Sequence, residues 1–325
     1  DAPVGHHNSL KFETINAVSP SGSHYFHIGQ NIEGHNFAAT GWNASESGRT
    51  ETKQPCTLSF WVKSSNPGKW CASLKGMGNH THSYLIVYEI EKPNTWEWKT
   101  HTIYPSSEIN NWNTGNTTAM RIQFDVGTSR VSDLGTGVVN KWQNHNTYTY
   151  NNDEFQPTRI HGISGATWYI TGVQFEPGPV ATPFEQRSFG EELELCQRYF
   201  QSNFPTGVAP QNGYYNSNTG LAAGFNGVVC FATNQLRSPH IMFNPKMRVE
   251  PDVTIYAASS DDDDGRWAAY NGSWSSNSAN TVDKFGNTGF GVRYPSGGIS
   301  ATAGNAYLYR GMWTADAELP ATYSP

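Results

Sequence analysis

The sequence predicts an almost entirely β protein of two domains, and its composition, its length and its hydrophobic alternation support this prediction. Charged residues make up 15% of the chain, below the roughly 25% of ordinary globular domains, while aromatic residues reach 13%. Asn, Ser, Thr and Gly supply the polar character instead, and they favour turns and strand edges over helix interiors. With 325 residues, 36% of them hydrophobic, the chain is long enough for two cores.

Short alternating runs, punctuated by Gly, Pro, Asn and Ser, fill the first half of the chain and predict antiparallel strands with one buried face. Leu58, Phe60 and Val62 show this period of two, and residues 120–126 show it most cleanly. The expected strands cover residues 10–15, 26–32, 58–62, 84–90, 96–100, 120–126 and 166–175. About eight strands suit an antiparallel two-sheet sandwich or jelly roll.

A helix signal interrupts the strands at Ser188, because Glu191 follows it three residues later and the two can form a capping box. Leu193, Cys196 and Phe200 then share one face, so we expect this short helix to pack beside a sheet. We place the domain boundary just before it, which gives a jelly-roll domain over residues 1–186 and a second β-rich domain over residues 187–325. The strands expected in this second domain cover residues 227–232, 240–243, 253–256, 289–294 and 306–309.

Charge and hydropathy exclude two classes of partner. The net charge is −6 and no run of Lys or Arg is present, so nucleic acid is not an expected partner. No apolar stretch approaches the roughly 20 residues that span a bilayer, so we expect no membrane insertion. The first residues, beginning with Asp1, resemble neither a signal peptide nor an initiator methionine, which favours a fragment or a processed product.

The four cysteines are too few and too scattered for a disulfide framework, so free thiols are expected. A bridge between Cys56 and Cys71 is the alternative.

Several segments carry a resemblance to a known family. They are WYITGVQFEPG (168–178), ATPFE (181–185), LCQRYF (195–200), residues 25–34, TLSFWVKS (57–64), NTWE (94–97) and the terminal WTADAEL (313–319). Together they are similar to a module of tail fibres and other structural proteins of tailed bacteriophages. The resemblance covers most of residues 1–200, and it implies a carbohydrate-binding-like jelly roll in a virion appendage, with no catalytic activity and no cofactor.

The sequence gives little evidence of a catalytic or metal-binding site. The sequence has no Gly-x-Ser-x-Gly elbow, phosphate-binding glycine loop or His-Glu-x-x-His. A glycan depolymerase remains an alternative function, because the two catalytic carboxylates of such an enzyme can lie far apart in sequence. The acidic run at 261–264 does not fit the spacing of a helix-loop-helix calcium site, so a solvated loop is favoured. His80 and His82 lie on one side of an extended segment and could bind a metal around a trimer axis, but chance pairing among 11 histidines is favoured.

Aromatic residues in polar segments are the candidate glycan contacts, since sugar C–H faces stack on Trp and Tyr while polar neighbours bond the hydroxyls. The candidates are Arg266, Trp267, Tyr270 and Trp274 in the second domain and Trp112 and Trp142 in the first. The alternative is that each Trp covers a sandwich edge or a subunit interface. We expect the 261–274 loop to contribute more than the first domain.

These observations favour a tail fibre or spike component, exposed on the particle surface, that attaches to host cell-surface glycans and contacts other virion proteins. The fibre-like module and the low charge favour a homotrimer that buries some of the surplus aromatic residues between subunits. A virion decoration or head-fibre protein without receptor activity is the second reading, and a depolymerase is the third.

Overall fold

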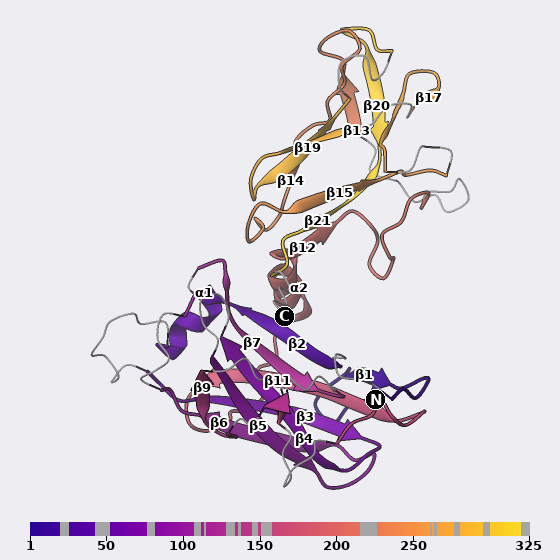
Figure 1. Cartoon of the computed structure of the whole chain (residues 1–325). Helices are drawn as coiled ribbons and strands as arrows, with labels where there is room; N and C mark the ends of the chain where they lie inside the picture. Colours follow the sequence, from indigo (N-terminus) through magenta and orange to yellow (C-terminus); the bar gives the residue numbers. More distant parts are fainter. Residues whose placement is uncertain are drawn as a thin grey trace. The chain divides into compact units, whose positions relative to one another are not determined.

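The computed structural model describes residues 1–19, 26–42, 53–76, 82–106, 112–113, 115–127, 134–135, 138–144, 149–150, 158–214, 226–260, 262, 265–275, 280–294 and 300–319. The described chain is mostly strand, in several antiparallel sheets, as the composition predicts (Figure 1). Its contacts divide it into two compact units, unit 1 over Asp1–Gln186 and unit 2 over Arg187–Pro320.

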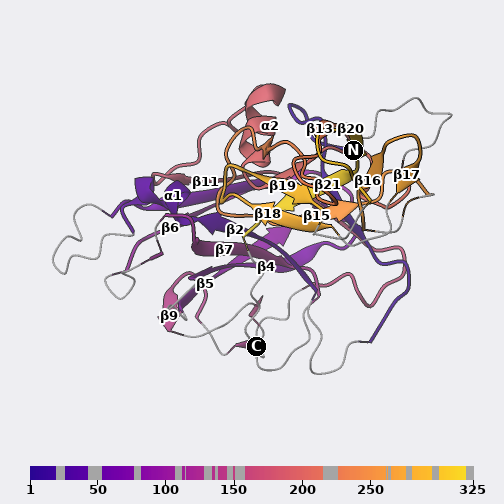
Figure 2. The ribbon, with the colours of Figure 1, turned by 90° about the horizontal axis from the view of Figure 1, so that it is seen from above.

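Unit 1 contains two antiparallel sheets that face each other as two layers (Figures 1 and 2). The four-stranded sheet has the order β1 (Leu10–Glu13), β11 (Thr167–Pro177), β3 (Cys56–Ser64) and β6 (Glu97–Ile103). The five-stranded sheet has the order β2 (His27–Glu33), β7 (Thr118–Asp125), β4 (Gly68–Gly76), β5 (His82–Ile90) and β9 (Trp142–Asn144). Smaller elements are α1 (Gly34–Phe37), the 3-10 turn η1 (Ala38–Thr40), and the parallel pair β8 (Leu134–Gly135) and β10 (Thr149–Tyr150).

The core of unit 1 forms where the alternating side chains of both sheets meet. Leu58, Phe60 and Val62 of β3 are fully buried, and Trp70 and Leu74 of β4 meet them from the other sheet. The sequence analysis did not predict β4, although Trp70, Ala72 and Leu74 alternate with Cys71, Ser73 and Lys75 along it. In the structure both sets are buried, which a period of two does not predict for the polar set.

The predicted helix is present as α2 (Phe189–Gln197), and the Ser188 hydroxyl accepts a hydrogen bond from the Glu191 backbone N–H at 3.3 Å. This confirms Ser188 as the N-cap, but among the described residues the Glu191 carboxylate does not bond back to the Ser188 N–H, so only half of the expected capping box is formed. The expected burial of an apolar face is not seen, because no residue of α2 is buried and Leu193 remains 43% exposed. The backbone just after the helix joins unit 2, where the Arg198 carbonyl accepts from the Arg248 N–H and the Tyr199 carbonyl from the Ala317 N–H.

Unit 2 contains three antiparallel sheets around a separate core. One sheet has the order β12 (Phe200–Ser202), β21 (Met312–Asp316), β15 (Asp252–Tyr256), and another β14 (Ile241–Met242), β19 (Gly289–Arg293), β18 (Thr281–Lys284). The third has the order β13 (Asn226–Val229), β20 (Ala306–Arg310), β16 (Ala268–Tyr270), β17 (Trp274–Ser275). Phe243, Phe290 and Trp313 pack ring against ring in the core, with centroids 5.2–6.0 Å apart.

The four cysteines are free, as the sequence predicts. Cys56 points into the core of unit 1, where burial raises the pKa of its thiol to about 12. Within the described ranges no helix is long and apolar enough to cross a membrane.

Candidate functional site

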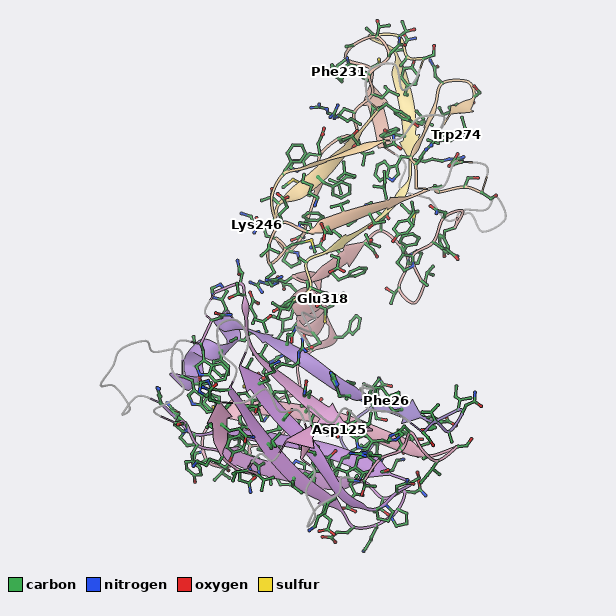
Figure 3. All side chains as sticks on the ribbon, in the orientation of Figure 1. Phe26, Asp125, Phe231, Lys246, Trp274 and Glu318 are labelled. Carbon is green, nitrogen blue, oxygen red and sulfur yellow. The ribbon has the colours of Figure 1, made fainter. Side chains whose placement is uncertain are left out.

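The β16–β17 hairpin of unit 2 holds an exposed aromatic pair, Tyr270 and Trp274. The register places the two residues directly opposite each other, and their ring centroids lie 5.1 Å apart at 45°. Gly272 in the connecting turn has a φ of +90°, a conformation that glycine adopts without strain. Each ring is 36% exposed, and Trp274 is marked on this hairpin in Figure 3.

A buried ion pair lies beneath the Trp274 ring. The Arg310 guanidinium carbon is 3.8 Å from the ring centroid, which is a close cation–π contact. Arg310 Nη2 and Nε bond the two carboxylate oxygens of Asp262 at 2.7 and 3.0 Å, and both side chains are at most 6% exposed. Because the pair is bidentate and buried, it fixes the guanidinium plane on which one face of the indole rests.

The aromatic pair continues into an exposed apolar row across the sheet. Leu308 of β20 lies opposite Tyr270 in the register and is 45% exposed. Directly opposite residues of antiparallel strands point to the same face, so Leu308, Tyr270 and Trp274 form one line of side chains. We call these three residues the hairpin platform. An exposed row of two aromatic rings and one aliphatic side chain is a surface on which a sugar ring can stack.

The structure corrects the prediction for Trp267, which is 1% exposed and belongs to the core of unit 2. Its indole N–H donates to the Met312 carbonyl at 3.0 Å, and its ring lies so close to Gly311 that a Cβ there would meet it at 1.9 Å. Arg266, the preceding residue, is only partly exposed. The exposed aromatic residues of the predicted loop are therefore Tyr270 and Trp274.

Trp112 and Trp142 in unit 1 are also corrected, because they are 2% and 5% exposed. Trp142 lies 5.6 Å from Trp42 and 5.7 Å from Trp112 between ring centroids, and Phe37 lies 5.1 Å from Trp112. Their Asn-rich flanks suggested exposed loops, but the rings turn inward and build one end of the core.

The acidic run at 261–264 is not simply a solvated loop, because Asp262 is buried against Arg310. Asp261, Asp263 and Asp264 lie outside the described residues. Sequence reasoning missed Arg310 and the role of Asp262, since the two lie 48 positions apart and no local pattern joins them. Of the two histidines considered for a metal, His82 begins β5 and His80 lies outside the described residues; the described ranges hold no group of three or more His, Cys, Asp or Glu side chains that could bind one.

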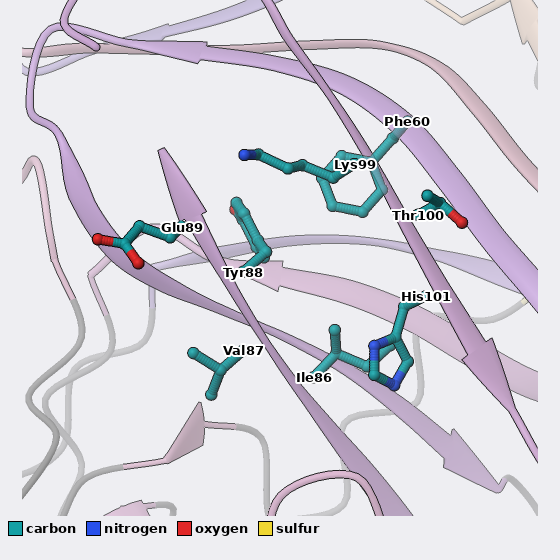
Figure 4. Close-up of a pocket in the computed structure, with 8 residues that line it drawn as sticks. All are labelled: Phe60, Ile86, Val87, Tyr88, Glu89, Lys99, Thr100 and His101. Atoms are coloured by element: carbon teal, nitrogen blue, oxygen red, sulfur yellow. The ribbon is translucent and has the colours of Figure 1, made fainter. Parts of the chain in front are cut away.

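A small cavity of about 150 Å³ opens at the edge of the sandwich in unit 1, between β5 and β6 (Figure 4). Its lining is Phe60, Ile86, Val87, Tyr88, Glu89, Lys99, Thr100 and His101. Burial lowers the pKa of His101, whose Nε2 lies 3.4 Å from the Tyr84 hydroxyl. Glu89 is the single carboxylate of this lining, whereas glycoside hydrolysis commonly uses two facing carboxylates.

The chain is therefore a mostly β protein of two units, and the second unit carries an exposed aromatic surface, the hairpin platform. No protein-family model matches the chain, and no curated protein matches it. Among solved structures, the PBSX exported protein XepA is similar over 95% of this chain and 84% of its own, with 8% identity and a TM-score of 0.19. A likeness at this TM-score carries no argument about fold or function.

Proposed function

We propose that the chain is a non-enzymatic structural protein of a tailed-phage virion, a tail fibre or spike component that binds host surface glycans. The hairpin platform is the observation that carries the glycan-binding part. The resemblance of residues 168–200 and of the upstream segments to tail-fibre modules supports the virion assignment. The same resemblance, with two facing antiparallel sheets in unit 1, supports a jelly-roll topology for that unit.

The platform suits a pyranose ring for two physical reasons. Sugar C–H groups carry partial positive charge and are attracted to the π-face of an indole or phenol ring. The ion pair beneath Trp274 holds the ring in place before a ligand arrives, so less conformational entropy is lost on binding.

The proposal includes a homotrimer, in which part of the exposed apolar surface is buried between subunits. Light scattering of the purified chain at micromolar concentration measures this directly. A decoration or head-fibre protein is the competing function, and it differs by having no glycan ligand. A depolymerase differs by releasing reducing ends from capsular polysaccharide.

The test is binding of the purified full chain to an array of bacterial surface glycans, followed by titration of the strongest ligand. Replacing Trp274 with Ala removes about 1 kcal/mol of stacking, which is about fivefold in affinity. Phe231→Ala is the matched control, because Phe231 is an exposed aromatic residue of unit 2 outside the platform. Glycan binding that Trp274→Ala leaves unchanged would refute the platform, and absence of binding by the unmodified chain would favour the decoration protein.

A further inference from the structure

A second aromatic surface lies in unit 1, on the outer face of the four-stranded sheet, away from the core. It is a groove of about 220 Å³. Trp61, Trp98 and Ser59 form its floor, and His6, Thr182 and Phe184 line it above the sheet. We call it the Trp61–Trp98 groove.

The floor is set by the pairing of β3 with β6. Trp61 and Trp98 are directly opposite in the register, and Trp98 is 46% exposed. Trp61 points away from the core because it alternates with the buried Phe60 and Val62 of β3, and Trp98 lies on the same face because it is directly opposite Trp61. Within the described chain neither indole N–H has a hydrogen-bond partner, so both can donate to a ligand.

Ser59 adds a buried polar group to the floor. Its side chain belongs to a residue that is only 3% exposed, it lines the groove, and its hydroxyl has no hydrogen-bond partner among the described residues. This hydroxyl can donate to or accept from a ligand hydroxyl that enters the groove.

The walls are held in position by bonds to β11. The Thr182 backbone N–H and hydroxyl donate to the Glu176 carboxylate at 2.8 and 2.6 Å, and the Glu185 N–H donates to the Gln174 side-chain oxygen at 2.9 Å. The His6 ring packs against the Phe184 ring, with centroids 5.2 Å apart. The groove is therefore formed before any ligand binds.

The approach of His6 depends on Gly172, which interrupts β11 with a φ of +58°. A Cβ at position 172 would lie 2.6 Å from the His6 ring, so glycine is required for this close contact. The irregular register between Thr171 and Gln174 thus creates the space in which the wall sits.

The charge of the lining limits the ligand class. In the part of the chain that the structure describes, no carboxylate, ammonium or guanidinium group lines the groove. Two charged groups on the strands that flank the groove have partners of their own: Lys63 pairs with Asp1 and stacks on Tyr169, and Glu176 is bonded by Thr182. A charged ligand would lose its hydration here without gaining a partner.

We propose that the Trp61–Trp98 groove binds one pyranose ring of an uncharged hexose. The two indoles stack on the C–H face, while Ser59 and the indole N–H groups bond ring hydroxyls. Its volume is below the roughly 300–1,000 Å³ of pockets that enclose drug-sized ligands, so it takes a single ring and not an oligosaccharide. This site is independent of the hairpin platform, and it would give one chain two points of glycan attachment.

The experiment is saturation-transfer NMR with methyl β-glucopyranoside and methyl β-galactopyranoside, and with glucuronate as the charged analogue. It uses the full chain carrying Trp274→Ala, so that failure of the platform does not affect the result. We expect saturable transfer with at least one neutral glycoside and none with glucuronate. Trp98→Ala should weaken the affinity about fivefold or more, and Trp98→Phe should restore part of it.

Trp96→Ala is the matched control, because Trp96 precedes the same strand, contacts Tyr169 and does not line the groove. It should leave the affinity unchanged, and melting curves of each variant show that unit 1 is folded. No saturable transfer with either neutral glycoside, equal affinity of Trp98→Ala, or preferential binding of glucuronate would each overturn the proposal.

Discussion

Removing the Asp262 carboxylate should destabilise unit 2 far more than its place in an acidic run suggests. In Asp262→Ala the Arg310 guanidinium stays buried, with its side chain 6% exposed, and loses both charge-assisted bonds. Leaving one partner of a buried ion pair uncompensated costs about 3–5 kcal/mol. Asp262 Oδ2 also accepts from the Ser259 N–H at 3.2 Å, so a second buried donor loses its partner.

The expected change in melting temperature follows from these values. For a domain of this size about 1 kcal/mol corresponds to roughly 3–6 °C, so unit 2 should melt roughly 10–30 °C lower. Differential scanning calorimetry of the full chain measures this, because the two units have separate cores and each contributes its own unfolding enthalpy.

A double variant separates the lost pair from a general disturbance. In Asp262→Ala with Arg310→Met no buried charge remains, and methionine can still pack under the Trp274 ring. It should recover most of the stability that Asp262→Ala loses. If the double variant is as unstable as the single one, or if Asp262→Ala costs less than about 1 kcal/mol, the assigned energetics are wrong.

Two further predictions concern single side chains. Trp267→Ala should cost unit 2 about 3–5 kcal/mol, because it empties a fully buried site, whereas Trp274→Ala should cost about 1 kcal/mol or less; equal losses in calorimetry would contradict this contrast. His101 has a pKa lowered by burial from 6.5, so the unfolded chain takes up its proton first as the pH falls. The contribution of His101 to the stability of unit 1 should therefore be fully present above about pH 6.5 and be lost as the pH falls below it. In urea titrations, His101→Gln should reduce the dependence of the free energy of unfolding on pH. An unchanged pH dependence would show that another group is responsible.

Several secondary-structure elements could be predicted from interactions between residues that are close in the sequence. The capping of α2 involves two residues three positions apart, so the sequence contains all of its determinants. The alternation in β3, β5 and β7 likewise records which side chains face the core, and these strands lie where the sequence predicts them. In unit 2 the two-residue strand β14 lies within a predicted segment, whereas β16 and β17 were not predicted, because two or three residues carry too little periodicity.

The candidate sites depended on contacts between distant parts of the chain. Trp112 and Trp142 sit among polar residues, and only their contacts with Trp42 and Phe37 show that they are buried. Tyr270 and Trp274 could be chosen from the sequence because they flank a turn, but Arg310 beneath them comes from another strand.

In the Trp61–Trp98 groove, too, one part could be predicted from the sequence and the rest depends on the tertiary structure. The sequence places Trp61 on the face of β3 opposite to Phe60 and Val62, which is a property of the strand period. Its pairing with Trp98 and the walls from His6 and Phe184 come from segments up to 178 positions apart in the chain, since 184 − 6 = 178. Strand periodicity is a local property that the sequence determines, whereas burial and site geometry depend on which distant segments pack together, and only the tertiary structure decides that.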